Sequence, residues 1–290
     1  MAHSSNYEHV IPSRRHLVEA DLNVRKDAIA ENFWINYPQA EKILAQVRFI
    51  VDLPRTGDGY CLVIHSQPGM GKSALFRRLM MEFGMTSGAT DCLAQLEIDS
   101  ERARDHKTFS NDLVSALTLG TVASYSGSKK RLLNAIGARN VRGIGIDEFN
   151  NLLATTPREQ LKNLIQIKTI SGPPYSLVVI IFGTSECREA IEHDTQFSRR
   201  FYDSELLPWK DDEIFRTFVY SYVSTFPLQR PSVIDKPAVT KYLINETGGV
   251  LGRVVNLLKN AAWWSIIDGA ERIDLDILKK GREIPMKLER

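Results

Sequence analysis

The sequence predicts an α/β protein in which a parallel sheet lies between layers of helices, followed by a small all-helical domain. Three observations lead to this prediction. Short apolar runs alternate with helical patterns from about residue 34 to Pro208, as in chains that build parallel sheets. Beyond Pro208 only helical patterns remain. A glycine-rich turn that ends in Gly71-Lys72-Ser73 joins the first apolar run to a helical pattern.

The α/β domain is expected over residues 34–208, after a polar N-terminal arm over 1–33 that shows no sustained hydrophobic period. The segment 34–51 carries its apolar residues on one helical face. The run "YCLVIH" then predicts a buried strand, because it is almost entirely apolar. The further strands are expected at 92–98, 143–148, 176–186 and near 204–207, and the helices between them at 73–83, 107–120, 129–137 and 157–170.

The helical domain is expected over residues 209–290. Asp211 is predicted to cap its first helix. Asp235 and Pro237 open the second helix, which Gly248-Gly249 closes. Two more helices are expected at 253–267 and 275–281.

The composition argues against several classes of protein. Hydrophobic residues make up 43% and charged residues 25% of the 290 residues, the balance of an ordinary globular protein. No run of 18 apolar residues occurs, and the N-terminus lacks the apolar segment of a secretory signal, so we expect no membrane association. Three widely spaced cysteines in apolar runs favour reduced thiols in the cytoplasm, and six scattered histidines argue against a metalloenzyme.

The stretch "HSQPGMGKSALFRR", which begins at His65, has the form of a phosphate-binding loop. Backbone N–H groups must curl around the phosphates, which favours Gly69 and Gly71 where the chain approaches the ligand. Lys72 would reach the β- and γ-phosphates, and the Ser73 hydroxyl would bind Mg²⁺. The other loop residues expected to contact the nucleotide are Gln67, Pro68, Met70 and Ala74.

Ser66 stands where the pattern G-x-x-x-x-G-K-[ST] has its first glycine. A small residue is tolerable there if its φ stays negative, because only a positive φ demands glycine. The strand before the loop and the helix after it supply the context that the motif requires. We therefore expect a working nucleotide site, with ATP and Mg²⁺ as cofactors.

A carboxylate at the end of a neighbouring strand is needed beside such a loop, and "VRGIGIDEFNNLL" supplies a pair. Asp147 is predicted to hold the water shell of the Mg²⁺ ion, together with Ser73. Glu148 is predicted to polarise the attacking water. A D-E pair after an apolar run is weak evidence by itself, but it follows the phosphate loop by the spacing expected of a nucleotide hydrolase.

These motifs resemble those of the AAA+ ATPases. The segments that carry the resemblance are "QPGMGKS", "GIDEFNNLL", "VIIFGTSE", "FSRRF" and "ETGGVLGRVVNLLKNAA", which together extend over about Trp34–Gly281. More narrowly, the chain resembles the TniB/TnsC regulators of transposition. This narrower resemblance rests on the compact size, the D-E-x-x-N-L-L continuation and the G-x-x-G-R-x-x-N-L-L segment.

The resemblance implies roles for further residues. Thr184 matches the polar sensor that contacts the γ-phosphate or the lytic water. Arg200 matches the arginine finger that enters a neighbouring subunit's site, with Arg199 as the other candidate, so hydrolysis would require an oligomer. Arg253 matches a second sensor in the helical domain, and Ile35 and Tyr37 would flank the adenine.

The resemblance also implies partners and a location. These are double-stranded DNA bound without sequence preference, a DDE transposase, often a TniQ-type adaptor, further copies of the chain in a ring or helical filament, and the bacterial cytosol. With a net charge of only +2, DNA binding would depend on local basic clusters. The residues expected to contact DNA are Arg102, Arg104, Lys107, Lys129 and Lys130.

Two other functions are compatible with the same motifs. One is a loader or initiator-like AAA+ ATPase of replication or repair, although such proteins usually add a winged-helix domain after the helical domain. The other is a nucleotide-gated signalling scaffold that barely hydrolyses ATP; Glu148 and Thr184 argue for hydrolysis. A GTPase is disfavoured because no N-K-x-D motif occurs.

Overall fold

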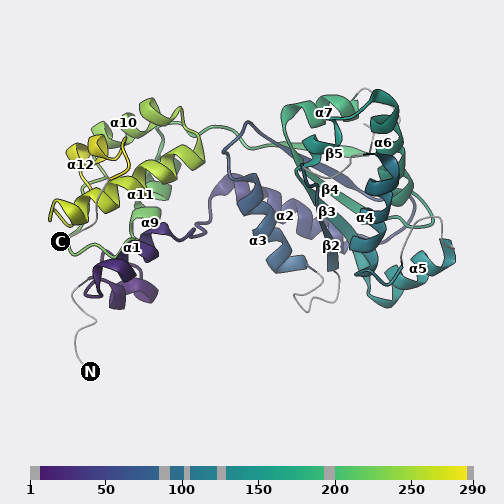
Figure 1. Cartoon of the computed structure of the whole chain (residues 1–290), viewed down its shortest axis with the longest axis horizontal. Coiled ribbons are helices and arrows are strands. Elements are labelled where there is room, and N and C mark those ends of the chain that lie inside the picture. Colours follow the sequence, from purple (N-terminus) through teal and green to yellow (C-terminus); the bar gives the residue numbers. More distant parts are fainter. Residues whose placement is uncertain (1–6, 85–91, 101–104, 123–128, 193–199, 286–290) are drawn as a thin grey trace. The chain divides into compact units, whose positions relative to one another are not determined.

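A computed structural model describes residues 7–84, 92–100, 105–122, 129–192 and 200–285 of the chain (Figure 1). The chain divides into two compact units. One is continuous, Gln39–Leu207, and contains the sheet. The other is discontinuous, because Met1–Pro38 joins Pro208–Arg290 in a helical unit. None of the helices among the described residues is both long and apolar enough to cross a membrane.

The α/β unit is built on a five-stranded sheet in the order β2-β3-β4-β1-β5. Each neighbouring pair is parallel, which confirms the predicted parallel sheet. The central strands are buried along nearly their whole length, which explains why they are continuous apolar runs in the sequence. The strands are β1 (Cys61–His65), β2 (Cys92–Glu97), β3 (Val141–Asp147), β4 (Val178–Gly183) and β5 (Phe201–Glu205).

Helices cover both faces of the sheet, as predicted (Figure 1). On one face, α4 (His106–Thr118), α5 (Lys129–Ala138), α6 (Pro157–Ser171) and α7 (Ser185–Glu192) enclose the main apolar core with the strands. On the other face, Phe76 and Met80 of α3 (Lys72–Phe83) lie so close to Gly145 that a Cβ there would be 2.8 Å from Met80. α2 (Pro38–Asp52) is joined to α3 by the ion pair between Arg48 and Glu82, at 2.5 Å.

Two elements of this unit differ from the sequence prediction. The last strand is Phe201–Glu205, three residues earlier than expected. It lies at an edge of the sheet and Tyr202, Asp203 and Glu205 are exposed, so no apolar run marks it. The short helix α7 was not predicted, and its polar sequence "SECREAIE" explains why.

The helical unit contains α9 (Glu213–Val223), α10 (Pro237–Thr247), α11 (Leu251–Ile267) and α12 (Leu275–Lys280). Its first helix is capped by Asp212 and not by the predicted Asp211, since the Asp212 carboxylate accepts from Phe215 N at 2.8 Å. Gly248 closes α10 in the left-handed conformation, with φ 62°, which only glycine adopts readily.

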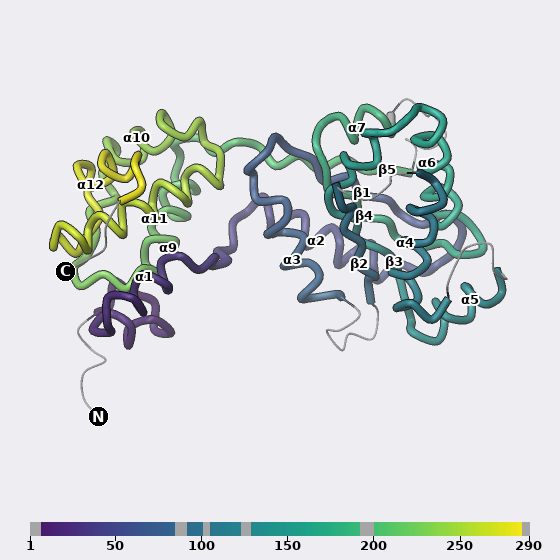
Figure 2. Tube along the Cα trace, in the orientation of Figure 1, coloured from purple at the N-terminus to yellow at the C-terminus, as the bar shows by residue number. Residues whose placement is uncertain are grey.

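The described part of the expected N-terminal arm is folded and belongs to the helical unit. It forms the 3₁₀ helix η1 (Pro12–Leu17) and helix α1 (Leu22–Ala30), which lie beside the C-terminal helices (Figure 2). Arg25 of α1 is 6% exposed. Its guanidinium donates to the Glu271 carboxylate, at 3.1 Å through one nitrogen, and to the Pro227 carbonyl at 2.9 Å. The Lys259 ammonium donates to Ala30 O at 2.7 Å, so the end of α1 is also tied to α11.

Candidate functional site

The ends of three strands meet at one edge of the sheet. His65 of β1 lies opposite Gly183 of β4, and Ile146 of β3 lies opposite Ile181 of β4. The loop after β1, the two carboxylates at the end of β3 and the threonine after β4 therefore lie at the carboxyl edge of the sheet. This is the edge at which open parallel sheets bind their ligands.

The loop between β1 and α3 has the backbone that a phosphate cradle requires. Gly69 and Gly71 have φ of 83° and 86°, in the region that favours glycine. Gly71 is also the N-cap of α3, so the loop runs directly into a helix N-terminus. The Lys72 ammonium lies over the loop and donates to Ser66 O at 3.2 Å and to Gln67 O at 3.4 Å.

Ser66 fits the loop without strain. It is fully buried and is not among the residues with positive φ, as expected for a residue that replaces glycine at this position. Its N–H donates to Gly183 O at 3.3 Å, and its hydroxyl oxygen accepts from the Lys72 ammonium at 3.1 Å. The serine thus adds a contact to Lys72 that a glycine could not make.

Asp147, the last residue of β3, reaches the start of α3. The residue is 4% exposed, and its carboxyl group hydrogen-bonds with the side chain of Ser73. Burial is the largest cause that raises the pKa of Asp147, while hydrogen bonds from Glu148 N and the Ser73 side chain act in the opposite direction. The two groups predicted to hold Mg²⁺ are therefore in direct contact.

The Lys72 ammonium lies within electrostatic range of both carboxylates. Burial lowers the pKa of Lys72, because the charged form loses solvation. The charges of Glu148 and Asp147 act in the opposite direction and favour the ammonium. The structure thus brings one cation, one hydroxyl and two carboxyl groups together beside the loop.

Glu148 has a left-handed backbone, with φ 54° and ψ 38°. Residues other than glycine take this conformation at a cost and are concentrated at functional sites. Its carboxylate accepts from Asn150 Nδ2 at 3.3 Å. Asn150 was not predicted from the sequence, although the two polar residues in the otherwise apolar run "FNNLL" are a signal.

Thr184 follows β4 directly, at the same edge of the sheet. Its hydroxyl donates to Glu186 Oε2 at 3.4 Å and lies 3.9 Å from Cys187 Sγ. Cys187 is fully buried, which raises the pKa of its thiol, and it is close enough to Lys72 for the charge of the ammonium to act in the opposite direction. The threonine is therefore in the neighbourhood of the loop, as its predicted sensor role requires.

Arg200 lies at the opposite, amino edge of the sheet. It precedes β5, and Cys61 N at the start of β1 donates to its carbonyl at 3.1 Å. Its guanidinium is 2.9 Å from Asp58 Oδ2 and donates to Lys168 O at 3.4 Å. Arg199, the other candidate for the finger, lies outside the described residues.

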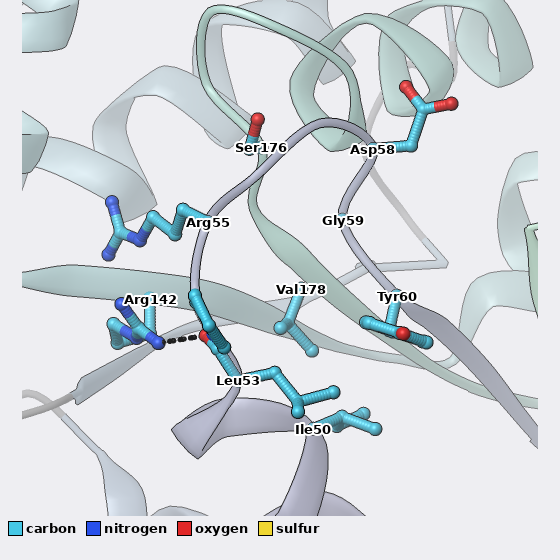
Figure 3. Close-up of a pocket in the computed structure, with 10 residues that line it drawn as sticks. Ile50, Leu53, Arg55, Asp58, Gly59, Tyr60, Arg142, Ser176 and Val178 are labelled. Carbon is cyan, nitrogen blue, oxygen red and sulfur yellow. Dashed lines mark hydrogen bonds between the residues drawn. The ribbon is translucent and has the colours of Figure 1, made fainter.

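Two more arginines bind backbone around a cavity of about 10 Å³ at this amino edge (Figure 3). Arg142 donates to Val51 O at 2.8 Å and also to Leu53 O. Arg55 donates to Val141 O. These contacts fix the segment between α2 and β1, which carries Asp58.

The residues expected to contact the base and to act as second sensor lie in the helical unit. Tyr37 is 6% exposed, and its ring lies 5.3 Å from that of Trp209 and 6.1 Å from that of Phe218. A hollow of about 280 Å³ extends between Asn36–Pro38 and α9. Ile35 is half-buried just before it, and Arg253 is exposed in the first turn of α11.

The described basic residues are exposed at helix starts. Lys107 lies in the first turn of α4, and Lys129 and Lys130 are the first two residues of α5. Arg102 and Arg104 lie outside the described residues. Three cations in a row at the start of α5, including Arg131, oppose the helix dipole, so helix stability does not account for them.

The chain is similar to known proteins. A family model described as "Bacterial TniB protein" matches residues 25–211, more than half of the chain. A comparison with curated protein sequences finds no match.

Solved structures with a similar fold come from several organisms. The Aeropyrum pernix ORC1 protein in complex with DNA has a TM-score of 0.61 at 16% identity, over 89% of this chain and 68% of that one. Drosophila ORC bound to DNA has a TM-score of 0.57 at 14% identity, over 90% and 65%. The Thermotoga maritima RuvB Holliday junction branch migration motor has a TM-score of 0.52 at 14% identity, over 86% and 70%. This chain thus spans about two thirds of the length of these chains, and its fold is that of the AAA+ ATPases.

Proposed function

The chain belongs to the TniB family, and from this premise we propose that it is an ATPase that regulates DNA transposition. In this proposal it assembles on double-stranded DNA with ATP and recruits a transposase, with a TniQ-type adaptor as a further partner. One observation supports the ATPase activity: four functional side chains lie together at one edge of the sheet, those of Lys72, Ser73, Asp147 and Glu148. Membership of the TniB family supports the role in transposition.

The residues beside the loop have the chemistry that ATP and Mg²⁺ require. The loop backbone and the Lys72 ammonium would bind the phosphates. The Ser73 hydroxyl and the Asp147 carboxylate, already in contact, are hard oxygen ligands of the kind that Mg²⁺ prefers. When bound, the ion would neutralise charge on the phosphates.

The remaining steps fall to three side chains. Glu148 would accept a proton from the attacking water through its carboxylate. The Thr184 hydroxyl would orient that water or the γ-phosphate. An arginine from a neighbouring copy would stabilise the charge that develops on the transferred phosphate.

Electron microscopy of the full chain tests assembly directly. We expect rings or helical filaments when double-stranded DNA and a non-hydrolysable ATP analogue are both present, and none with either alone. Assembly on DNA without nucleotide would contradict the proposal, because the nucleotide is expected to join the subunits.

The basic residues at helix starts support the DNA part of the proposal. Each copy offers few phosphate contacts, since the net charge is only +2. Repetition along an assembly would multiply these contacts and bind DNA tightly without reading its sequence. ATP would then control DNA binding by controlling assembly.

Removing the charges of Lys107, Lys129 and Lys130 together by alanine is expected to weaken DNA binding at physiological salt by at least tenfold. The loss should be about equal for every DNA sequence, and the slope of log affinity against log salt should become shallower by about 2 to 3 per subunit. Fluorescence anisotropy across a salt titration, with the ATP analogue present, measures both quantities.

A second triple variant provides the matched control. It removes three exposed lysines of the helical unit, Lys236, Lys241 and Lys279. Both variants should bind ATP normally. If the two variants bound DNA with equal affinity, the DNA contact would have to lie elsewhere on the surface.

Arg200→Ala is expected to bind ATP normally and to hydrolyse it at least tenfold more slowly, if the guanidinium acts on a neighbour's nucleotide. The ion pair with Asp58 calls for a matched variant, because losing it could disturb the amino edge of the sheet. Asp58→Ala breaks the same pair and keeps the arginine. If the steady-state turnover of Asp58→Ala is close to wild type, the loss in Arg200→Ala is due to the missing guanidinium and not to the broken ion pair. An equal loss of turnover in both variants would show that Arg200 has a structural role.

Mixing Arg200→Ala with a variant that lacks Lys72 completes this test. Each variant retains the half of the composite site that the other lacks, so mixed assemblies should recover part of the turnover. If turnover did not recover in assemblies shown to contain both variants, Arg200 would not act in trans. Arg199 would then be the remaining candidate for the arginine finger.

A further inference from the structure

The carboxylate of Glu148 is held by a neighbour in its own chain. The left-handed backbone at Glu148 turns the chain sharply out of β3 and into the 3₁₀ helix η2 (Phe149–Leu152). That turn brings Asn150, two residues later, within 3.3 Å of Glu148 Oε2. Glu148 and Asn150 are both half-buried.

The helix that carries Asn150 is firmly anchored. Phe149 and Leu152 are 1% and 2% exposed and belong to the main core. Asn151 donates to Ile98 O at 2.8 Å, which fixes η2 to the end of β2. The helix also packs on β4 and α7, the elements on either side of Thr184. The Asn150 amide is thus a donor at a fixed place beside the site.

We propose that Asn150 is a positioning residue for Glu148. Its amide binds Oε2 and orients the carboxylate, which leaves Oε1 to accept the proton of the attacking water. This inference rests on the proposed ATPase function, and no other reaction is invoked. Asn150 touches neither water nor nucleotide in this role and acts only through Glu148.

Two consequences distinguish this role from a purely structural one. The hydrogen bond restricts the rotation of the carboxylate, so its loss should slow the chemical step without changing the binding of nucleotide. The loss should also vanish in a Glu148→Gln background, where the base that Asn150 orients is already gone. A residue that only stabilised η2 would lower turnover in either background.

The test compares variants of the full chain, assembled on double-stranded DNA. Asn150→Ala should lower kcat by about tenfold with KM for ATP within about twofold of wild type, and should lower it no further when Glu148 is replaced by glutamine. Asn150→Asp, which places a second carboxylate beside Glu148, should lower kcat at least as much, because it repels the carboxylate that the amide binds. The matched control, Gln160→Ala, removes an amide that donates to Leu153 O and Thr155 O just after η2, and it keeps Asn150 and its anchor.

Three outcomes decide the proposal. Loss of kcat at an unchanged KM in the Asn150 variants, absent both in the Glu148→Gln background and in Gln160→Ala, supports it. A wild-type kcat in Asn150→Ala, the same loss in both alanine variants, or a full further loss in the Glu148→Gln background overturns it while the proposed ATPase activity stands. No turnover in the wild-type chain with DNA would instead overturn the proposed function, and the positioning role with it.

Discussion

Replacing Lys72 by alanine is expected to weaken ATP binding by about 100-fold or more. The ammonium is preorganised over the loop by the Ser66 and Gln67 oxygens, 3.1 to 3.4 Å away. Its hydrogen bonds to phosphate would be charge-assisted, at about 1.5–3 kcal/mol each, so two lost bonds account for the expected effect. Isothermal titration calorimetry with ATP and Mg²⁺ measures it.

Ser66→Gly is the matched control for this variant. It restores the usual first glycine of the loop and removes only the hydroxyl that accepts from Lys72. We expect its ATP affinity to stay within about fivefold of wild type, because the two carbonyl oxygens still hold the ammonium. Equal affinity of wild type and Lys72→Ala would refute the assignment of this loop.

Glu148→Gln is expected to leave ATP binding unchanged and to lower turnover by about 10²–10⁴-fold. The amide keeps the size and the hydrogen bonds of the side chain but cannot accept a proton from water, which is the contribution of a general base. Steady-state phosphate release gives the turnover, and calorimetry gives the affinity.

Glu189→Gln removes an exposed carboxylate from α7 and serves as the control. Its turnover should match wild type. If Glu148→Gln hydrolysed ATP at the wild-type rate, another group would have to activate the water. The site would then be assigned to nucleotide binding alone.

The sequence is sufficient to predict the strands of the sheet centre and the neighbourhood of the phosphate loop. β1 and β4 are apolar because both faces are covered, and such runs are visible without a structure. The carboxyl ends of parallel strands share an edge, so Lys72 and Asp147 could be placed together from their order along the chain. Local chemistry and topology determine both features.

The N-terminal segment could not be predicted, because its burial depends on a distant ion pair. Arg25 lies on the inward face of α1, where a charged residue would normally indicate solvent. Its partner Glu271 is 246 residues away in the sequence. The contact between Asn150 and Glu148 was missed for a different reason: it depends on the left-handed backbone of one residue, which no residue type specifies except glycine.

The discontinuity of the helical unit imposes an order on biosynthesis. Residues 7–38 leave the ribosome before the α/β unit, yet their partners around Pro227, Lys259 and Glu271 are made after it. The whole α/β unit is translated in between and can acquire its own core while α1 waits without its partners. Closing contacts across more than 200 residues costs chain entropy that only the completed helical unit can offset. The helical unit can therefore close only after the α/β unit has been translated, when α1 docks on the helices that follow that unit.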